Sequence, residues 1–168
     1  MVKPNPSFDK INLGCGTDIL EGYLNVDFEK FKGVDFVCNL NKLPYPFKSS
    51  QFRKVYMRNV LEHLDNPWEV MKDVYRISSN GAIISLRVPH FSSHNAWGDL
   101  QHKRGFNTDT FKNDNVKHLF EIIKQEITFP RVRFFMRVIA NKFPSFYEKN
   151  LAYILPATDL VVHLRVRK

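Results

Sequence analysis

The segment from Ala82 to Val88 limits the possible folds more than any other part of this sequence. We interpret it as a continuous apolar strand, which is typical of a strand buried on both faces of a parallel sheet. A helix is predicted directly before it, with Asn66 as the N-cap, Pro67 at the first helical position and Asn80-Gly81 at the end. Its apolar stripe consists of Val70, Val74 and Ile77. A helix that leads into a buried strand indicates an α/β fold.

Strand-like and helix-like segments also alternate in the rest of the chain. Short apolar segments that resemble strands precede the helix, at residues 10–13, 23–27, 34–38 and 53–57. After the Ala82–Val88 strand we expect a helix over 108–118, a strand over 121–129, a helical and turn-like segment over 143–155, and an alternating strand over 159–167. This order predicts an α/β protein with a mostly parallel sheet.

Length and composition indicate an ordinary globular protein. The 168 residues correspond to one domain, residues 1–168. Hydrophobic residues make up 43% and charged residues 25%, which argues against a disordered or fibrous chain. Apolar runs fall short of the roughly 20 residues of a membrane span, and Met1–Lys10 is too polar for a signal peptide. With only Cys15 and Cys38, we expect no disulfide framework, no four-cysteine zinc site and a cytoplasmic location.

The positive charge is concentrated near the C-terminus. The chain has 25 Lys and Arg against 17 Asp and Glu, a net charge of +8. The basic residues from position 131 onward are Arg131, Arg133, Arg137, Lys142, Lys149, Arg165, Arg167 and Lys168, whereas Glu148 and Asp159 are acidic. Such a segment attracts nucleic acids, phosphorylated sugars or acidic membrane surfaces, or serves only as a solvated face.

Polar residues and glycines follow the first strands of the predicted sheet. Gly14 and Gly16 come directly after the first strand, and Asp27 ends the second. Glycines let a backbone approach a ligand closely, and an acid at this position can accept hydrogen bonds from both ribose hydroxyls. Asn39 follows the third strand and Asn59 the fourth. Because the carboxyl ends of parallel strands line one crevice, these residues predict a binding site for a nucleotide-like cofactor.

These motifs together resemble the class I S-adenosylmethionine-dependent methyltransferases, of the small type-11-like kind. The matching stretches are Ile11–Gly16, Leu24–Asp27, Asn39-Leu40 with Leu43–Phe47, and Asn59–Leu64. The resemblance is strong over residues 8–90 and weaker over Val88–Ser93 and Asp99–Phe106. It implies a Rossmann-like sheet of about seven strands, with the last two strands as an antiparallel pair at one edge. It also implies S-adenosyl-L-methionine as the cofactor.

The resemblance also assigns roles to individual residues. Gly14 and Gly16 would lie under the methionine part of the cofactor, Asp27 would bind the ribose, and Asn39 with Leu40 would face the adenine. Asn59 would lie near the sulfonium. The full set of expected cofactor-binding residues is Gly14, Cys15, Gly16, Asp27, Phe28, Asn39, Leu40, Asn59 and His63.

Several positions depart from the family pattern. Asn12 replaces an acid, Asp18 replaces a third glycine, and Asn39 replaces a frequent Asp. Ten residues separate Gly16 from Asp27, whereas a dinucleotide-binding motif has about 20 there. We therefore expect the first helix to be shortened or absent. This spacing argues against a nicotinamide dehydrogenase, whose pyrophosphate needs that helix.

The segment from Pro89 to Asn107 is a candidate for the acceptor loop. It has no clear periodicity, and unstructured loops of this length are usually functional or disordered. We predict His90 and His102 as general bases and Asp99 as the carboxylate that orients them. The alternatives are ordinary hydrogen-bonding roles, or a zinc or iron site that includes His94. We expect no metal, because i,i+4 spacing has no meaning on a loop.

The acceptor itself cannot be identified from these motifs, and three functions stay open. The resemblance favours methylation of a small molecule or glycan, and the basic segment and Lys103-Arg104 favour an anionic one. The alternatives are an RNA methyltransferase and a non-catalytic cofactor-binding protein on the same fold. Residues 1–90 would form the cofactor-binding half, and residues 91–168 the acceptor loop and the C-terminal strands.

Overall fold

The computed structural model describes residues 8–168, which form one seven-stranded sheet in the order β3-β2-β1-β4-β5-β7-β6. Strands β1 to β5 are parallel, and β7 runs antiparallel to both of its neighbours, β5 and β6. This confirms the predicted sheet and its antiparallel edge. The strands are β1 (Lys10–Leu13), β2 (Leu24–Asp27), β3 (Phe36–Val37), β4 (Phe52–Arg58), β5 (Ser78–Pro89), β6 (Phe120–Ile127) and β7 (Asp159–Val166).

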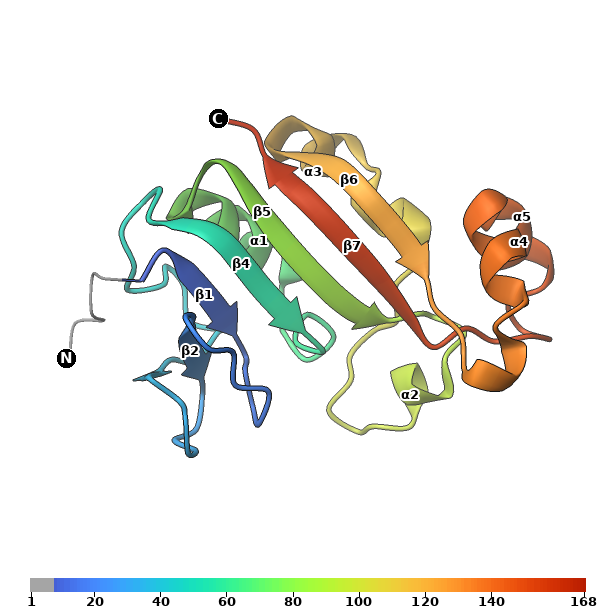
Figure 1. Cartoon of the computed structure of the whole chain (residues 1–168), viewed down its shortest axis with the longest axis horizontal. Coiled ribbons are helices and arrows are strands. Elements are labelled where there is room, and N and C mark those ends of the chain that lie inside the picture. The colour runs from blue at the N-terminus through green and yellow to red at the C-terminus, as the bar shows by residue number, and fades with distance from the viewer. Residues whose placement is uncertain (1–7) are drawn as a thin grey trace.

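Helices cover one face of this sheet. In Figure 1 the sheet faces the viewer, with α1 (Pro67–Ile77) and α3 (Asp114–Leu119) behind it. Right-handed crossovers put both on the same face, because both connections progress toward the β6 edge. The connections from β1 to β2 and from β2 to β3 progress the other way and would place helices on the front face. Residues 14–23 and 28–35 contain turns and no helix, so the first helix is absent, as predicted.

The strands alternate accordingly between a buried and a more open face. On β5, Ile84 and Leu86 are buried in the core, whereas Ser85 and Arg87 are only half-buried. On β7, Leu164 is buried and Arg165 is exposed. The prediction that Ala82–Val88 is buried on both faces is therefore wrong, because the front of the sheet has no helical layer.

The helix α1 begins as predicted but ends earlier. The Asn66 side chain accepts a hydrogen bond from the backbone N–H of Glu69, and Pro67 occupies the first turn. The helix ends at Ile77, and the Ser78 hydroxyl donates to the carbonyl of Val74. Asn80-Gly81 lies within β5, so its prediction as the end of the helix is wrong.

Two further helical predictions are corrected. The expected helix over 108–118 is divided into a 3-10 turn, η1 (Thr108–Phe111), and α3, each capped by its own Asn side chain. The expected segment over 143–155 contains α5 (Pro144–Asn150), and it is preceded by α4 (Met136–Lys142), which the sequence reading missed. The remaining elements are α2 (His94–Trp97) and η2 (Arg131–Arg133). Across residues 8–168, all helices are too short or too polar to cross a bilayer.

Candidate functional site

The turn after β1 brings the backbone close to the segment after β4. Gly14 has φ +68°, and a Cβ atom built on it would lie 2.5 Å from Cγ2 of Val60. The N–H groups of Gly14 and Cys15 both donate to the carbonyl of Val26, at 2.8 and 3.0 Å. A glycine is therefore required at position 14 both by the backbone angle and by the close packing.

Asp27 connects the end of β2 to the same turn. It is 5% exposed, and its Oδ2 accepts a hydrogen bond from the N–H of Gly16 at 2.7 Å. Its Oδ1 accepts from the N–H groups of Phe28 and Glu29. An ionised carboxylate offers about four lone-pair sites, so each oxygen retains capacity for a ligand hydroxyl.

Asn12 and Asp18, two positions that depart from the family pattern, are joined by a hydrogen bond and belong to one network with Asn25. Asn12 is buried, and its Nδ2 donates to Oδ1 of Asn25 at 3.0 Å and to the carbonyl of Asp18 at 2.7 Å. Asn25 in turn binds the backbone of Leu20 in both directions. These two amides thus tie the segment between Gly16 and β2 to the first two strands.

A cavity of about 510 Å³ lies at these strand ends, a typical size for a small-molecule site. It brings together all but one of the expected cofactor-binding residues, namely Gly14, Gly16, Asp27, Phe28, Asn39, Leu40, Asn59 and His63. Cys15 instead lines the adjacent cavity, with Asn12, Asp18 and Arg58. The residues that the sequence reading did not assign to it are Phe31, Asn41, Val60, Leu64 and Gln101. Val60 and Leu64 lie in the stretch Asn59–Leu64 that carries the resemblance, whereas nothing in the spacing of Phe31, Asn41 and Gln101 distinguishes them from ordinary loop positions.

Next to this cavity, Glu62, His63 and His102 form a cluster that the sequence reading did not identify. Their ligating atoms lie within 4.8 Å of one another, so the three side chains could hold a metal ion. The His63 and His102 rings meet edge to face, with centroids 4.6 Å apart. Burial, and then the neighbouring His102, lowers the pKa of His63. This ring is therefore neutral at pH 7 and can accept a proton.

Asp99 lies beside His102, the residue it was predicted to orient, but beyond hydrogen-bond distance. Nε2 of His102 lies 3.7 Å from Oδ2 of Asp99, and the ring is largely buried. Its other nitrogen, Nδ1, is buried and without a hydrogen-bond partner among the described residues. Asp99 thus lies on the Nε2 side of the ring, and the buried Nδ1 is left without a hydrogen bond among these residues.

His90 occupies a different environment from the one expected for a base. Its ring has no exposed surface, Nδ1 lies 2.8 Å from the Ser92 hydroxyl, and Nε2 lies 3.4 Å from Oε1 of Glu148. Glu148 also accepts hydrogen bonds from the N–H and the hydroxyl of Thr108. Both nitrogens of His90 are therefore turned into the protein and away from the cavity lining.

Several basic groups predicted to face an acceptor are engaged elsewhere. Lys103 pairs with Asp65, and the Arg104 guanidinium donates to backbone carbonyls of residues 61, 64 and 65. Lys168, at the end of β7, donates to Ser50 and to the carbonyl of Arg76, at the opposite end of the sheet. The C-terminal basic segment is thus divided between the two ends of the molecule.

Comparison with known proteins agrees with this geometry. Residues 11–86 match the methyltransferase domain family. An S-adenosylmethionine-dependent methyltransferase structure from Archaeoglobus fulgidus covers 95% of this chain, over 88% of its own length, with 16% identity and a TM-score of 0.69. One from Mesorhizobium loti covers 98%, over 93% of its own length, with 14% identity and a TM-score of 0.61. The chain thus resembles the class I S-adenosylmethionine-dependent methyltransferases in sequence over residues 11–86 and shares their fold over nearly its whole length.

The family match and these neighbours imply S-adenosylmethionine as the cofactor, as the motifs predicted. At 14–16% identity, the neighbours show the fold and leave the reaction open. The [4+2]-cyclase SpnF has the same fold, with 16% identity, a TM-score of 0.63, and coverage of 94% of this chain and 75% of its own. No curated protein matches the sequence.

Proposed function

We propose that this protein is a methyltransferase that transfers the methyl group of S-adenosylmethionine to an anionic small-molecule or glycan acceptor. The observation that carries the proposal is the cavity at the ends of β1 to β4. It collects eight of the nine residues that the motifs select for the cofactor. Residues from four separate segments are thus combined in one space of suitable size.

The proposed binding mode assigns the ribose to Asp27 and the adenine to Asn39 and Leu40. Gly16 leaves room for the methionine chain, because the space beside its Cα is open, whereas Gly14 packs closely against Val60. When bound, the cofactor supplies an electrophilic methyl group for in-line displacement. The protein's contribution is alignment of the acceptor, an effect of up to about 7–11 kcal/mol.

For removal of a proton from the acceptor, we assign His102, oriented by Asp99, and the neutral His63. His63 lines the cavity directly, and His102 packs against its ring. His90 is left out of this assignment, because its ring is fully buried between Ser92 and Glu148. The proposed site therefore contains His102, one of the two histidines predicted as bases, and His63, which the resemblance had assigned to the cofactor.

The anionic character of the acceptor is proposed from the basic residues at the carboxyl end of the parallel strands. Arg131, Arg133 and Lys142 lie in the segment that follows β6, which ends at that side of the sheet. Acceptor binding that weakens as salt increases would support an electrostatic contribution. Tight RNA binding with a steep salt dependence would instead favour the RNA methyltransferase.

Cofactor binding can be measured by titration calorimetry with S-adenosylhomocysteine. We expect wild-type protein to bind it and Asp27→Asn to bind about tenfold or more weakly, because one carboxylate oxygen becomes an amide donor. The matched control is Glu29→Gln, since Glu29 is exposed two residues after Asp27 and lines neither cavity. No binding to the wild type, or equal binding to Asp27→Asn, would contradict the proposal.

The base assignment can be tested by turnover, after a screen of metabolites with labelled methyl donor has found an acceptor. His102→Ala should reduce kcat by roughly 10²–10⁴-fold and leave the affinity for S-adenosylhomocysteine unchanged. His94→Ala serves as the control, because His94 is an exposed residue of α2 in the same loop. Binding without turnover of any acceptor would favour the non-catalytic alternative, and full turnover by His102→Ala would remove His102 from the mechanism.

A further inference from the structure

The connection between β6 and β7 is much longer than the sheet requires. These strands are antiparallel neighbours, and Ile127 pairs with Leu160, so their adjoining ends lie together. A hairpin of this kind needs roughly 2–5 residues. Residues 128–158 are used instead, and they contain η2, α4 and α5. We call residues 131–155 the β6–β7 insert.

This insert exposes most of the large apolar side chains on the described surface. Nine of the seventeen exposed large hydrophobic residues in residues 8–168 lie within it. They are Val132, Phe134, Phe135, Val138, Ile139, Phe143, Phe146, Tyr153 and Ile154. Five of these side chains are more than 70% exposed. Soluble monomers rarely concentrate apolar side chains in this way unless the surface binds something.

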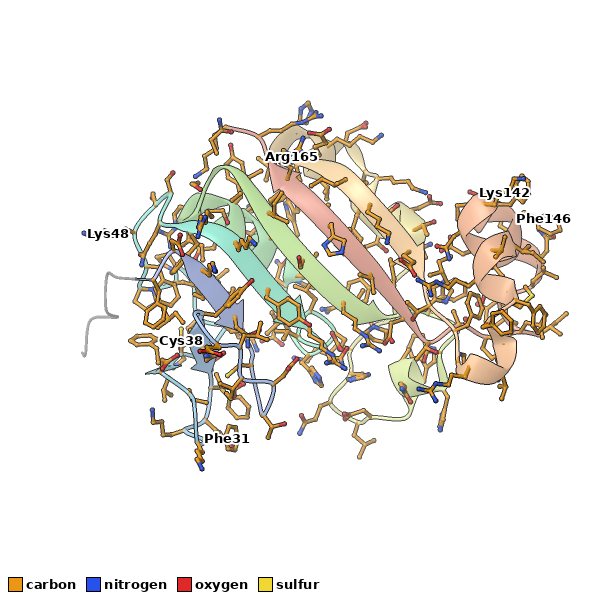
Figure 2. The ribbon with its side chains drawn as sticks, viewed as in Figure 1. Phe31, Cys38, Lys48, Lys142, Phe146 and Arg165 are labelled. Atoms are coloured by element: carbon orange, nitrogen blue, oxygen red, sulfur yellow. The ribbon has the colours of Figure 1, made fainter. Side chains whose placement is uncertain are left out.

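The charged residues of the insert are almost all basic. They are Arg131, Arg133, Arg137, Lys142, Lys149 and the single acid Glu148. Glu148 is buried against His90 and Thr108, so the described surface of the insert carries no exposed acid. Figure 2 shows Lys142 and Phe146 together on this end of the molecule, away from Lys48 at the other. Apolar and basic groups therefore share one surface, although Arg137 pairs with Glu126 of β6 and Arg133 donates to the carbonyl of Pro156.

This composition favours an anionic bilayer over a second copy of the chain as the binding partner of the insert. A second copy of the chain would place one basic, apolar insert against another, and the like charges would repel. Aromatic and aliphatic side chains beside Lys and Arg are typical of segments that lie in the interface of an anionic bilayer. There the apolar groups enter the boundary of the acyl chains, and the basic groups meet the lipid phosphates.

We propose that the β6–β7 insert binds the surface of an anionic phospholipid bilayer. Tyr153 packs on Phe91, with ring centroids 5.6 Å apart, and Phe91 begins the loop that carries Gln101 to the cofactor cavity. The insert and the cavity thus lie at the same end of the sheet, so docking holds the cavity near the bilayer. The inference goes beyond the proposed methyl transfer and does not depend on it, although the same basic residues are those that support an anionic acceptor.

The test is co-sedimentation of the whole protein with vesicles, without cofactor. Vesicles of phosphatidylcholine mixed with phosphatidylserine should retain the protein, and vesicles of phosphatidylcholine alone should retain much less. The double variant Phe134→Ser/Val138→Ser should bind about tenfold or more weakly, since both side chains are over 70% exposed and contribute little to the core. Ile123→Ser, an exposed apolar residue on β6, is the control and should bind as the wild type does.

A second pair of variants separates the charge from the apolar groups. Lys142→Glu should weaken binding to the anionic vesicles, and Lys48→Glu, at the other end of the molecule, should not. Equal binding to both vesicle types, or undiminished binding of Phe134→Ser/Val138→Ser, would overturn the proposal. A stable dimer in solution that those same substitutions dissociate would overturn it too, in favour of a second copy as the occupant.

Discussion

Glu62 is the most strongly perturbed carboxyl group near the cavity. Its side chain has no exposed surface, and neither carboxylate oxygen has a hydrogen-bond partner among the described residues. Burial raises the pKa of Glu62 to about 7. The folded state therefore retains the proton in a pH range where the unfolded chain, with an ordinary pKa near 4.5, has lost it.

The burial of Glu62 makes the folded protein less stable as pH rises. Between pH 4.5 and about 7 the folded state binds more protons than the unfolded state, so the free energy of unfolding falls as pH rises, by a few kcal/mol in total. Glu62→Gln stays uncharged and should lose this dependence, with a higher Tm than the wild type at pH 8. Thermal unfolding across this pH range measures it, with Glu21→Gln, exposed in the turn before β2, as the control. An identical pH profile of Tm for wild type and Glu62→Gln would refute the assignment.

At this scale the sequence predicted the residues whose role depends on local backbone. Gly14 and Asp27 could be found because a turn after one strand and an acid at the end of the next have fixed positions in a parallel sheet. Glu62 and the pair of His63 with His102 could not be found as a cluster. Their meeting depends on how residues 89–107 fold back across the strand ends, which no spacing in the sequence encodes.

Among the elements, β7 displays the one-sided burial of the sheet most clearly. Leu164 points into the helix-covered core, and the next residue, Arg165, is exposed on the other face and pairs with Glu121. Figure 2 labels Arg165 near the end of this strand. Adjacent positions on one strand thus experience different environments, because successive side chains point to opposite faces.

This difference can be measured with two neighbouring substitutions. Leu164→Ala should reduce the free energy of unfolding by about 2–5 kcal/mol, because it leaves a cavity in the core. Arg165→Ala should change it by no more than about 0.5 kcal/mol, because exposed ion pairs contribute little. Urea denaturation gives both values. Comparable losses at the two positions would mean that the front face is covered in solution.

The element predictions succeeded where a periodic pattern or a capping residue was present. The strands were located to within a few residues, and Asn66 with Pro67 marked the start of α1. The helix α4 was missed because apolar residues lie all round it, on its buried and its exposed face alike, so no amphipathic pattern marks it. Met136 and Ala140 are buried, whereas Val138 and Ile139 are exposed.

At the scale of the whole molecule, Glu148 joins three distant segments. From α5 in the β6–β7 insert it accepts hydrogen bonds from Thr108 at the start of η1, and it faces His90 at the end of β5. Burial would raise its pKa, but the hydrogen bonds from His90 and Thr108 outweigh that effect and lower it. Its stabilising contribution is thus present above the ordinary pKa of a Glu and is lost as pH falls through the lowered value.

Removal of the Glu148 carboxylate should make both residues 90–107 and the β6–β7 insert more mobile. Glu148→Ala leaves the Thr108 donors and His90 without their partner and should cost about 3 kcal/mol of folding free energy. Hydrogen exchange should accelerate both in residues 90–107 and in the insert. Lys149→Ala, an exposed neighbour on α5, should change neither. Faster exchange confined to one of the two segments would contradict the joint role of Glu148.

The sequence by itself determined the positions of the strands along the chain, the nucleotide-type turn and the loss of the first helix, because these depend on local propensity, spacing and chain length. The ten residues between Gly16 and Asp27 leave no room for a full crossover helix, whatever the rest of the chain does. Only the tertiary structure decided that Ser85 and Arg87 lie on an open face, that His90 is buried, and that the basic segment is divided between two ends. Each of these outcomes depends on which layer or segment packs opposite a residue, and that is a property of the assembled fold.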